Sequence, residues 1–264
     1  MTFAERLAAL CRERRSHVCV GLDPLPDRLP AAVRGADDPV FAFNRAIIDA
    51  TLDLAPVYKP NLAFYEQLGL AGWTSLKKTV EYVAGRAIVI GDAKRGDIDS
   101  TAAAYARALF EVFGFDAGTV NAYQGADAVA PFLAYRDRGV FVLCRSSNRS
   151  AAELQDCRVG DQTVFERIAS LAVAWNGAGN CGLVAGATYP AELGRVRALA
   201  PGLPLLIPGV GAQGGDAAAA ARAAGGGPFV ISSSRGIMYA GDGPDFAEAA
   251  RRAATRLRDE IAAA

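Results

Sequence analysis

The densest group of ionisable side chains in this 264-residue chain is Asp92-Ala93-Lys94-Arg95-Gly96-Asp97, at the end of the apolar run 87–92. Asp92 and Lys94 are two residues apart, so both project to the same face if a strand continues through them. Carboxylates beside an ammonium group favour its protonated form. A lysine held in this way is suited to donating a proton to a strong base, and it is a poor Schiff-base nucleophile because that role needs a neutral amine.

The plainer alternative for this segment is a salt bridge at the rim of the fold, with Asp99 capping the helix that follows. We expect Asp99 to be that N-cap. The capping role does not explain Asp92 and Lys94, so the chemical interpretation stays open beside it.

Polar residues also follow or end other apolar runs. Asp23, before Pro24, is by itself typical of a turn, and Lys59 is by itself typical of a side chain that extends to solvent from a rim. Their repetition at the ends of several runs favours a shared site. The further members of this polar set are Asn61, Asn121, Ser146, Ser147 and Asn148.

Two loops rich in glycine or serine, 208–216 and 232–237, follow the last two apolar runs. Glycines let backbone N–H groups approach an anion, and an arginine such as Arg235 offers a planar, bidentate partner for phosphate. Many such loops are merely turns. The pair of them predicts a phosphate site.

Eight short apolar runs alternate with helix-like segments, and most are apolar throughout, as strands buried on both faces are. This alternation predicts a single-domain (β/α)8 TIM barrel over residues 1–264, with an open doubly wound sheet as the competitor. In such a barrel the active site lies at the carboxyl ends of the strands. The predicted strands are 18–22, 57–61, 87–92, 118–123, 139–144, 181–186, 204–209 and 228–233. The predicted helices are 39–54 (capped by Asp38), 73–84, 100–113, 161–175, 191–200, 216–224 and 244–261, with a weaker one at 124–135 and a loop at 149–160.

The composition excludes several classes of protein. The chain has 28 basic and 28 acidic residues, so no overall positive charge points to nucleic acid or to an anionic membrane. One histidine, His17, rules out a His-rich metal site, and we expect it to be structural. Five cysteines without a CxxC motif, no signal peptide and no apolar stretch of about 18 residues predict a reduced, cytoplasmic protein without a membrane span.

These motifs resemble the orotidine 5′-phosphate decarboxylase family, specifically its larger bacterial (type 2) form. The resemblance covers most of the chain in order. The matching stretches are VGLDPLPDRLP (20–30), VYKPNLAFYEQLG (57–69), GDAKRGDIDSTAAAYA (91–106), NAYQGADAVAPFL (121–133), LCRSSN (143–148), GLVAGATYPAEL (182–193), LIPGVGAQGG (206–215) and SSSRGIMYA (232–240). This chain departs from the family pattern at two places. The family usually has Thr-Ser-Asn where this chain has Ser146-Ser147-Asn148, and Asn-Pro-Tyr where it has Asn121-Ala122-Tyr123.

The resemblance implies a homodimeric barrel that converts orotidine 5′-monophosphate to UMP and CO₂ in pyrimidine biosynthesis, with no metal or organic cofactor. Lys94 would protonate C6 as CO₂ leaves, and Asp92 would lie against the departing carboxylate. Lys59 and Asp23 would hold the ribose hydroxyls.

The resemblance also implies a site shared between two subunits. Asp97 would come from the partner subunit, with Ile98 and Thr101 beside it. The remaining substrate-binding residues would be Ser147 at the pyrimidine and Gln213, Ser234 and Arg235 at the phosphate end.

Two alternatives remain at this point. One is a Mg²⁺-dependent sugar-phosphate decarboxylase or aldol-type synthase of the same superfamily, which needs a carboxylate cluster where this chain has Lys59. The other is a barrel that binds a nucleotide phosphate without catalysis, against which the set Lys59, Asp92, Lys94 and Asp97 argues.

Overall fold

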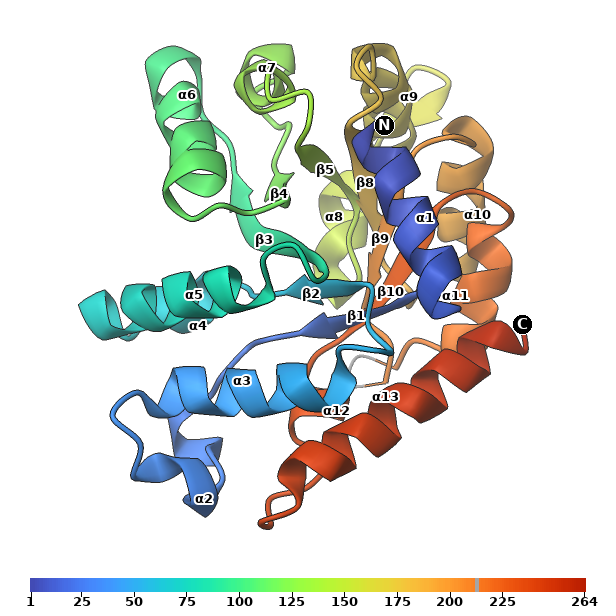
Figure 1. Cartoon of the computed structure of the whole chain (residues 1–264). Helices are drawn as coiled ribbons and strands as arrows, with labels where there is room; N and C mark the ends of the chain where they lie inside the picture. The colour runs from blue at the N-terminus through green and yellow to red at the C-terminus, as the bar shows by residue number, and fades with distance from the viewer. Residues whose placement is uncertain (212–213) are drawn as a thin grey trace.

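A computed structural model describes residues 1–211 and 214–264 of the chain. In this described part, eight parallel strands close into a barrel in the order β1-β10-β9-β8-β5-β4-β3-β2, and helices surround it (Figure 1). Each strand is hydrogen-bonded to both neighbours, so this sheet has no free edge among the described residues. The (β/α)8 barrel is therefore confirmed over the open doubly wound sheet.

Each of the eight predicted apolar runs overlaps a barrel strand. The clearest difference in length is at β3, which continues past the apolar run as far as Arg95 and carries the charged residues within the strand. The strands are β1 (Val18–Gly21), β2 (Val57–Lys59), β3 (Ile88–Arg95), β4 (Ala117–Val120), β5 (Gly139–Arg145), β8 (Cys181–Ala185), β9 (Leu205–Pro208) and β10 (Phe229–Ser233).

Most helices lie between successive strands; α1 precedes β1, and α12 and α13 follow β10. The longer ones are α1 (Phe3–Arg14), α3 (Pro39–Thr51), α5 (Gly69–Val83), α6 (Asp99–Arg107), α7 (Ala126–Leu133), α9 (Val164–Trp175), α10 (Pro190–Leu199), α11 (Ala217–Ala224) and α13 (Phe246–Ala262). Shorter pieces are α2 (Ala31–Arg34), α4 (Ala63–Glu66), α8 (Ala152–Gln155), α12 (Arg235–Met238), the 3₁₀ turns η1 (Pro26–Arg28) and η3 (Arg149–Ala151), and the π-helical turn η2 (Ala108–Val112).

Alternate residues of the strands divide the core into two layers. In β5, Val140 and Val142 pack outward in the large cluster beneath the helices, whereas Phe141 belongs to a second cluster that fills the barrel. Helix α1 closes the amino-terminal end of the barrel, where Phe3 meets Phe141 edge to face at 5.8 Å between ring centroids. Burial on both faces explains why the strands read as continuous apolar runs.

Local signals predicted the start of α3 correctly but placed the start of α9 three residues too early. Asp38 caps α3 by accepting a hydrogen bond from Phe41 N at 3.0 Å, and Pro39 occupies the first helical position, as predicted. Helix α9 begins at Val164 rather than at 161, because Thr163 and Glu166 form a reciprocal capping box.

Other expectations were wrong. Asp99 is not an N-cap: Ile98 holds that position, and Asp99 opens α6 with a φ of 48°. The segment 149–160 is not simply a loop, since it contains η3, α8 and β6 (Arg158–Val159), which pairs with β7 (Gln162–Thr163). By contrast, the weaker helix predicted at 124–135 is confirmed, since α7 forms in spite of Pro131 within it.

His17 has the structural role expected of it. Its ring stacks on Phe229 with centroids 4.2 Å apart, and its Nδ1 lies 2.9 Å from the Phe229 carbonyl oxygen. No helix among the described residues is long and apolar enough to cross a membrane.

Candidate active site

A cavity of about 530 Å³ opens at the carboxyl ends of the strands. It gathers side chains that lie far apart in the sequence, because each follows or ends a different strand of the barrel. Of the predicted site residues, those lining it are Asp23, Lys59, Asp92, Lys94, Ser147, Ser234 and Arg235. The prediction that these residues meet in one place is therefore confirmed, whereas their chemical roles remain predictions.

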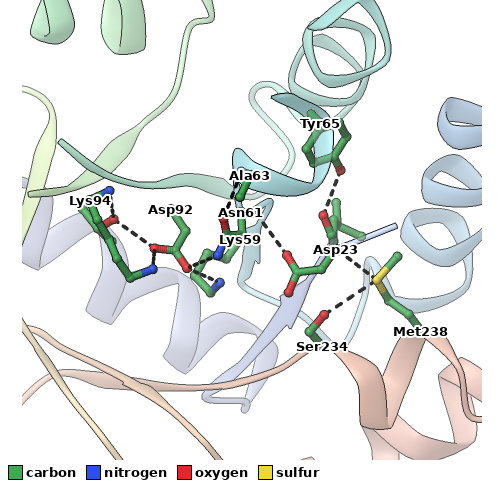
Figure 2. A network of polar contacts seen from close by, with 11 residues as sticks. Asp23, Lys59, Asn61, Ala63, Tyr65, Asp92, Lys94, Ser234 and Met238 are labelled. Atoms are coloured by element: carbon green, nitrogen blue, oxygen red, sulfur yellow. Dashed lines mark hydrogen bonds and ion pairs between the residues drawn. The ribbon is translucent and has the colours of Figure 1, made fainter. Parts of the chain in front are cut away.

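The centre of the cavity is the carboxylate of Asp92, which is shared between two lysines. Its Oδ2 lies 2.8 Å from Nζ of Lys59, and its Oδ1 lies 2.6 Å from Nζ of Lys94 (Figure 2). Burial alone would raise the pKa of Asp92, but the two ammonium groups hold that pKa well below its ordinary value. The two lysines therefore favour the ionised form of the carboxylate.

The two lysines differ in the exposure of their side chains. The Lys59 side chain is 7% exposed and that of Lys94 is 45% exposed. Burial would lower the pKa of Lys59, but the carboxylates of Asp92 and Asp23 outweigh it and raise that pKa above its ordinary value. Lys59 is thus a fixed charge, whereas Lys94 can reach into the cavity.

Lys94 stands on an irregular stretch of β3. Its φ of 48° lies in the left-handed region, and the pairing of β3 with β4 shifts register between Gly91 and Arg95. The Lys94 amide donates to Oγ1 of Thr119 at 2.9 Å, which anchors the irregular backbone to β4. Asp92 and Lys94 do meet, as predicted, but through this irregularity rather than through an unbroken strand.

Both the side chain and the backbone amide of Asp23 contact neighbouring segments of the chain. Its Oδ1 accepts a hydrogen bond from the Asn61 amide at 3.1 Å, and its own amide lies 3.0 Å from Sδ of Met238 (Figure 2). The buried Tyr65 hydroxyl donates to the Leu22 carbonyl at 2.8 Å, so the chain entering Asp23 is fixed as well. Asp23 lines the cavity together with Lys59.

The predicted phosphate loops both line the cavity. Pro208, Gly209 and Val210 follow β9, and Ser233 to Gly236 follow β10. The chain is tightly packed here, since a Cβ on Gly21 would lie 2.5 Å from Cβ of Ser234. Arg235 is exposed at the start of α12, which leaves its guanidinium able to meet a ligand. The predicted phosphate residue Gln213 lies outside the described residues.

Ser147 follows β5 and faces the loop after β8. Hydroxyl Oγ1 of Thr188 donates to the Ser147 carbonyl at 3.0 Å, and a Cβ on Gly186 would lie 2.7 Å from Cα of Ser147. The position of Ser147 is therefore set by close contact between these two loops.

Three predicted residues do not line the cavity of this chain. Asp97 and Ile98 lie in the connection from β3 to α6, and Thr101 lies in the first turn of α6. Ile98 is a large apolar side chain that is 46% exposed.

The sequence prediction missed one residue of the charged centre. Thr119 on β4 donates from Oγ1 to Oδ1 of Asp92 at 3.0 Å. A signal was present, because Thr119 is a hydroxyl residue inside the predicted strand 118–123, two residues before Asn121 of the polar set. Asn61, which was in that polar set but not among the predicted site residues, also lies within 3.4 Å of Oδ2 of Asp92 through its side-chain nitrogen.

Fold and site together define a class: a (β/α)8 barrel with a lysine–carboxylate centre and two anion-suited loops at its carboxyl mouth. The model of the orotidine 5′-phosphate decarboxylase / HUMPS family matches residues 16–253. The chain belongs to this family.

Individual relatives agree over almost the whole length. The chain is 49% identical to the orotidine 5′-phosphate decarboxylase of Thermomicrobium roseum, covering 99% of this chain and 95% of that protein. It is 50% identical to the enzyme of the same name from Azoarcus sp. (strain BH72), covering 99% and 98%. The solved structure of the Leishmania donovani OMP decarboxylase superposes with a TM-score of 0.86 at 39% identity, covering 100% and 98%.

Proposed function

We propose that this protein is an orotidine 5′-monophosphate decarboxylase, a carboxy-lyase that releases CO₂ and UMP in pyrimidine biosynthesis. The observation that carries the proposal is the Asp92 carboxylate held between the ammonium groups of Lys59 and Lys94 inside the barrel mouth. Membership of the family and near-complete coverage of relatives that bear this name support it.

The chemistry calls for a strong proton donor beside C6 of the pyrimidine. The bond from C6 to the carboxyl carbon breaks, its electron pair stays on C6, and CO₂ departs. A proton on Nζ of Lys94 passes to C6, and the resulting neutral amine regains a proton from solvent. Lys94 suits this role because it contacts Asp92 and is still partly exposed to the cavity.

Fixed charges supply the stabilisation. Electron density on C6 has no adjacent π-system to spread into, so the reaction needs a rate enhancement toward the upper end of the roughly 8–23 kcal/mol that enzymes provide. A preorganised ammonium group needs no reorientation as negative charge develops. The Asp92 carboxylate, placed against the departing carboxylate of the substrate, orients Lys94 and Lys59.

The rest of the cavity would bind the remainder of the nucleotide. Asp23 and Lys59 would form hydrogen bonds to the ribose hydroxyls, and Ser147 would contact the pyrimidine. Ser234 and Arg235, together with Gln213, would bind the phosphate.

We further propose that the reaction needs neither a metal ion nor an organic cofactor. Within residues 1–211 and 214–264, no group of three or more His, Cys, Asp or Glu side chains is arranged to hold a metal ion. Lys59 adds positive charge where a cation would otherwise have to bind. This arrangement favours the cofactor-free decarboxylase over a Mg²⁺-dependent relative.

A second copy of the chain would complete the site. Asp97, Ile98 and Thr101 lie outside the cavity of their own chain, and the exposed Ile98 gives an apolar contact for a partner. We propose a homodimer in which these three residues enter the partner's site. Residues 1–264 would form one domain of a cytoplasmic enzyme.

The test is the loss of orotidylate absorbance on incubation with the purified protein, with and without EDTA. We expect turnover that is unchanged by EDTA. Binding of UMP without turnover would instead favour a nucleotide-binding protein, and turnover abolished by EDTA and restored by Mg²⁺ would favour the metal-dependent alternative.

A further inference from the structure

Thr119 of β4 lies beneath the charged centre, and its residue is 1% exposed. Its hydroxyl connects two groups that the proposed reaction uses. The Lys94 amide lies 2.9 Å from Oγ1 of Thr119, and Oδ1 of Asp92 lies 3.0 Å from the same oxygen.

The directions of these hydrogen bonds are fixed by chemistry. A backbone N–H can only donate, so Oγ1 accepts from Lys94 and its own proton is free to go to the ionised Asp92, which can only accept. The same Oδ1 accepts from Nζ of Lys94 at 2.6 Å. These hydrogen bonds therefore form a closed ring that begins and ends on Lys94. The ring runs from the Lys94 amide through the Thr119 hydroxyl and the Asp92 carboxylate to the Lys94 ammonium group.

The backbone of Lys94 needs such an anchor. A φ of 48° is unfavourable for a residue with a side chain and persists where the surroundings over-determine it. The ladder between β3 and β4 is interrupted at this point, because their pairing shifts register between Gly91 and Arg95. The hydrogen bond from the Lys94 amide to the Thr119 hydroxyl therefore takes the place of a backbone hydrogen bond between β3 and β4.

We propose that Thr119 is a positioning residue, whose hydroxyl fixes the Asp92 carboxylate and the Lys94 backbone so that the Lys94 ammonium points at the reacting carbon. The inference rests on the proposed function. It assigns Thr119 no contact with substrate, so its effect is on turnover and not on affinity.

The experiment compares Thr119→Val, which keeps the shape and removes the hydroxyl, with Thr119→Ser, which keeps the hydroxyl. Thr51→Val is the matched control, because Thr51 is equally buried and its hydroxyl bonds to Ile47 O and the Tyr58 hydroxyl away from the cavity. For each variant we would measure kcat and KM for orotidine 5′-monophosphate, Kd for UMP, and Tm.

We expect Thr119→Val to lower kcat about 10- to 100-fold, since small misplacements of a catalytic group have effects of this size. Its KM and the UMP Kd should stay within threefold of the wild type. Thr119→Ser and Thr51→Val should keep kcat within fivefold.

A folded Thr119→Val protein with kcat within fivefold of the wild type would overturn the proposal. If Thr119→Val does not fold, Thr119→Ser decides: retention of kcat within fivefold supports the hydroxyl, and a larger loss in the folded protein overturns it. A wild-type protein without decarboxylase activity would refute the proposed function itself, which keeps the two failures distinct.

Discussion

The ammonium group of Lys94 lies 2.6 Å from Oδ1 of Asp92, although the backbone between them leaves regular strand geometry. The second oxygen of Asp92 is 2.8 Å from the buried Lys59 ammonium. Asp92 is thereby fixed from both sides, and Lys94 is the partner that retains access to the cavity. In the proposed reaction, this asymmetry favours Lys94 as the proton donor and Lys59 as the static charge.

Replacement of Lys94 by alanine removes the proposed proton donor and the charge nearest the reacting carbon. We expect Lys94→Ala to lower kcat by at least about 10³-fold, combining the usual contributions of general acid catalysis and of preorganised charge. The Kd for UMP, measured by calorimetry, should stay within tenfold. Lys77→Ala, at an exposed position of α5, is the control and should be fully active. Near-normal turnover by Lys94→Ala would refute the assigned role.

Replacement of Asp92 by asparagine leaves the buried Lys59 ammonium without its carboxylate. Loss of one partner of a buried ion pair typically costs about 3–5 kcal/mol, so the free energy of unfolding in urea at pH 7 should fall by that amount. Asp242→Asn, at an exposed position, should change it by less than about 0.5 kcal/mol.

The deficit of Asp92→Asn should also depend on pH. Because folding lowers the pKa of Asp92, its stabilising contribution is fully present above the unfolded value of about 4 and is lost as the pH falls toward the lowered folded value. The difference between wild type and variant should therefore be largest near pH 7 and shrink below about pH 4. A constant difference from pH 7 to pH 3 would show that ionisation of Asp92 does not stabilise the fold.

The sequence alone predicted the barrel and most of the cavity for one physical reason. Strands buried on both faces are readable as apolar runs, and the ends of parallel strands converge, so Asp23, Lys59 and Asp92 could be brought together without coordinates. Thr119 was visible only as a hydroxyl residue within a predicted strand, and its contact with Asp92 and Lys94 could not be found in this way. Its role depends on the register shift between β3 and β4, and pairing irregularities leave no periodic pattern in the sequence.

The error at Asp99 has a related origin. An aspartate before a helical segment is a good N-cap when its backbone is extended. Here Ile98 is the extended residue, with a φ of −104° and a ψ of 160°, and Asp99 already lies in α6. Propensity identified the helix start to within one residue but not which side chain faces the free amides.

The proposed shared site makes a complementation prediction. Inactive Lys94→Ala and Asp97→Ala proteins, mixed under conditions that allow subunits to exchange, should regain about a quarter of wild-type activity. Half of the dimers would be hybrids, and each hybrid would contain one intact and one doubly altered site. Exchange would be verified by native mass spectrometry. Confirmed exchange without recovery would show that Asp97 acts within its own chain.

Arg235 should matter only for the phosphate end of the substrate. Hydrogen bonds to charged groups contribute about 1.5–3 kcal/mol, so Arg235→Ala should lower kcat/KM for orotidine 5′-monophosphate by about 10- to 150-fold. Decarboxylation of the nucleoside orotidine, which lacks the phosphate, should be unchanged. Arg256→Ala, at an exposed position of α13, should leave both substrates unaffected. An equal loss with both substrates would place Arg235 in a general structural role.

A single methyl group at Gly186 should disturb the pyrimidine side of the cavity. A Cβ at this position would lie 2.7 Å from both Cα and Cβ of Ser147, so the loop after β5 must move away. We expect Gly186→Ala to lower kcat/KM at least tenfold if Ser147 contacts substrate as proposed, because a displacement of about 1 Å at such a contact has large effects on rate.

Gly194 in α10 offers the matched control for that substitution, since a Cβ there would meet no atom within 4 Å. Gly194→Ala should leave kcat/KM unchanged and raise the free energy of unfolding by about 0.5–1 kcal/mol, the usual gain of alanine over glycine within a helix. Equal kinetics for the two alanine variants would mean that Ser147 tolerates the displacement. The contact between the β5 and β8 loops would then not determine how the pyrimidine is held.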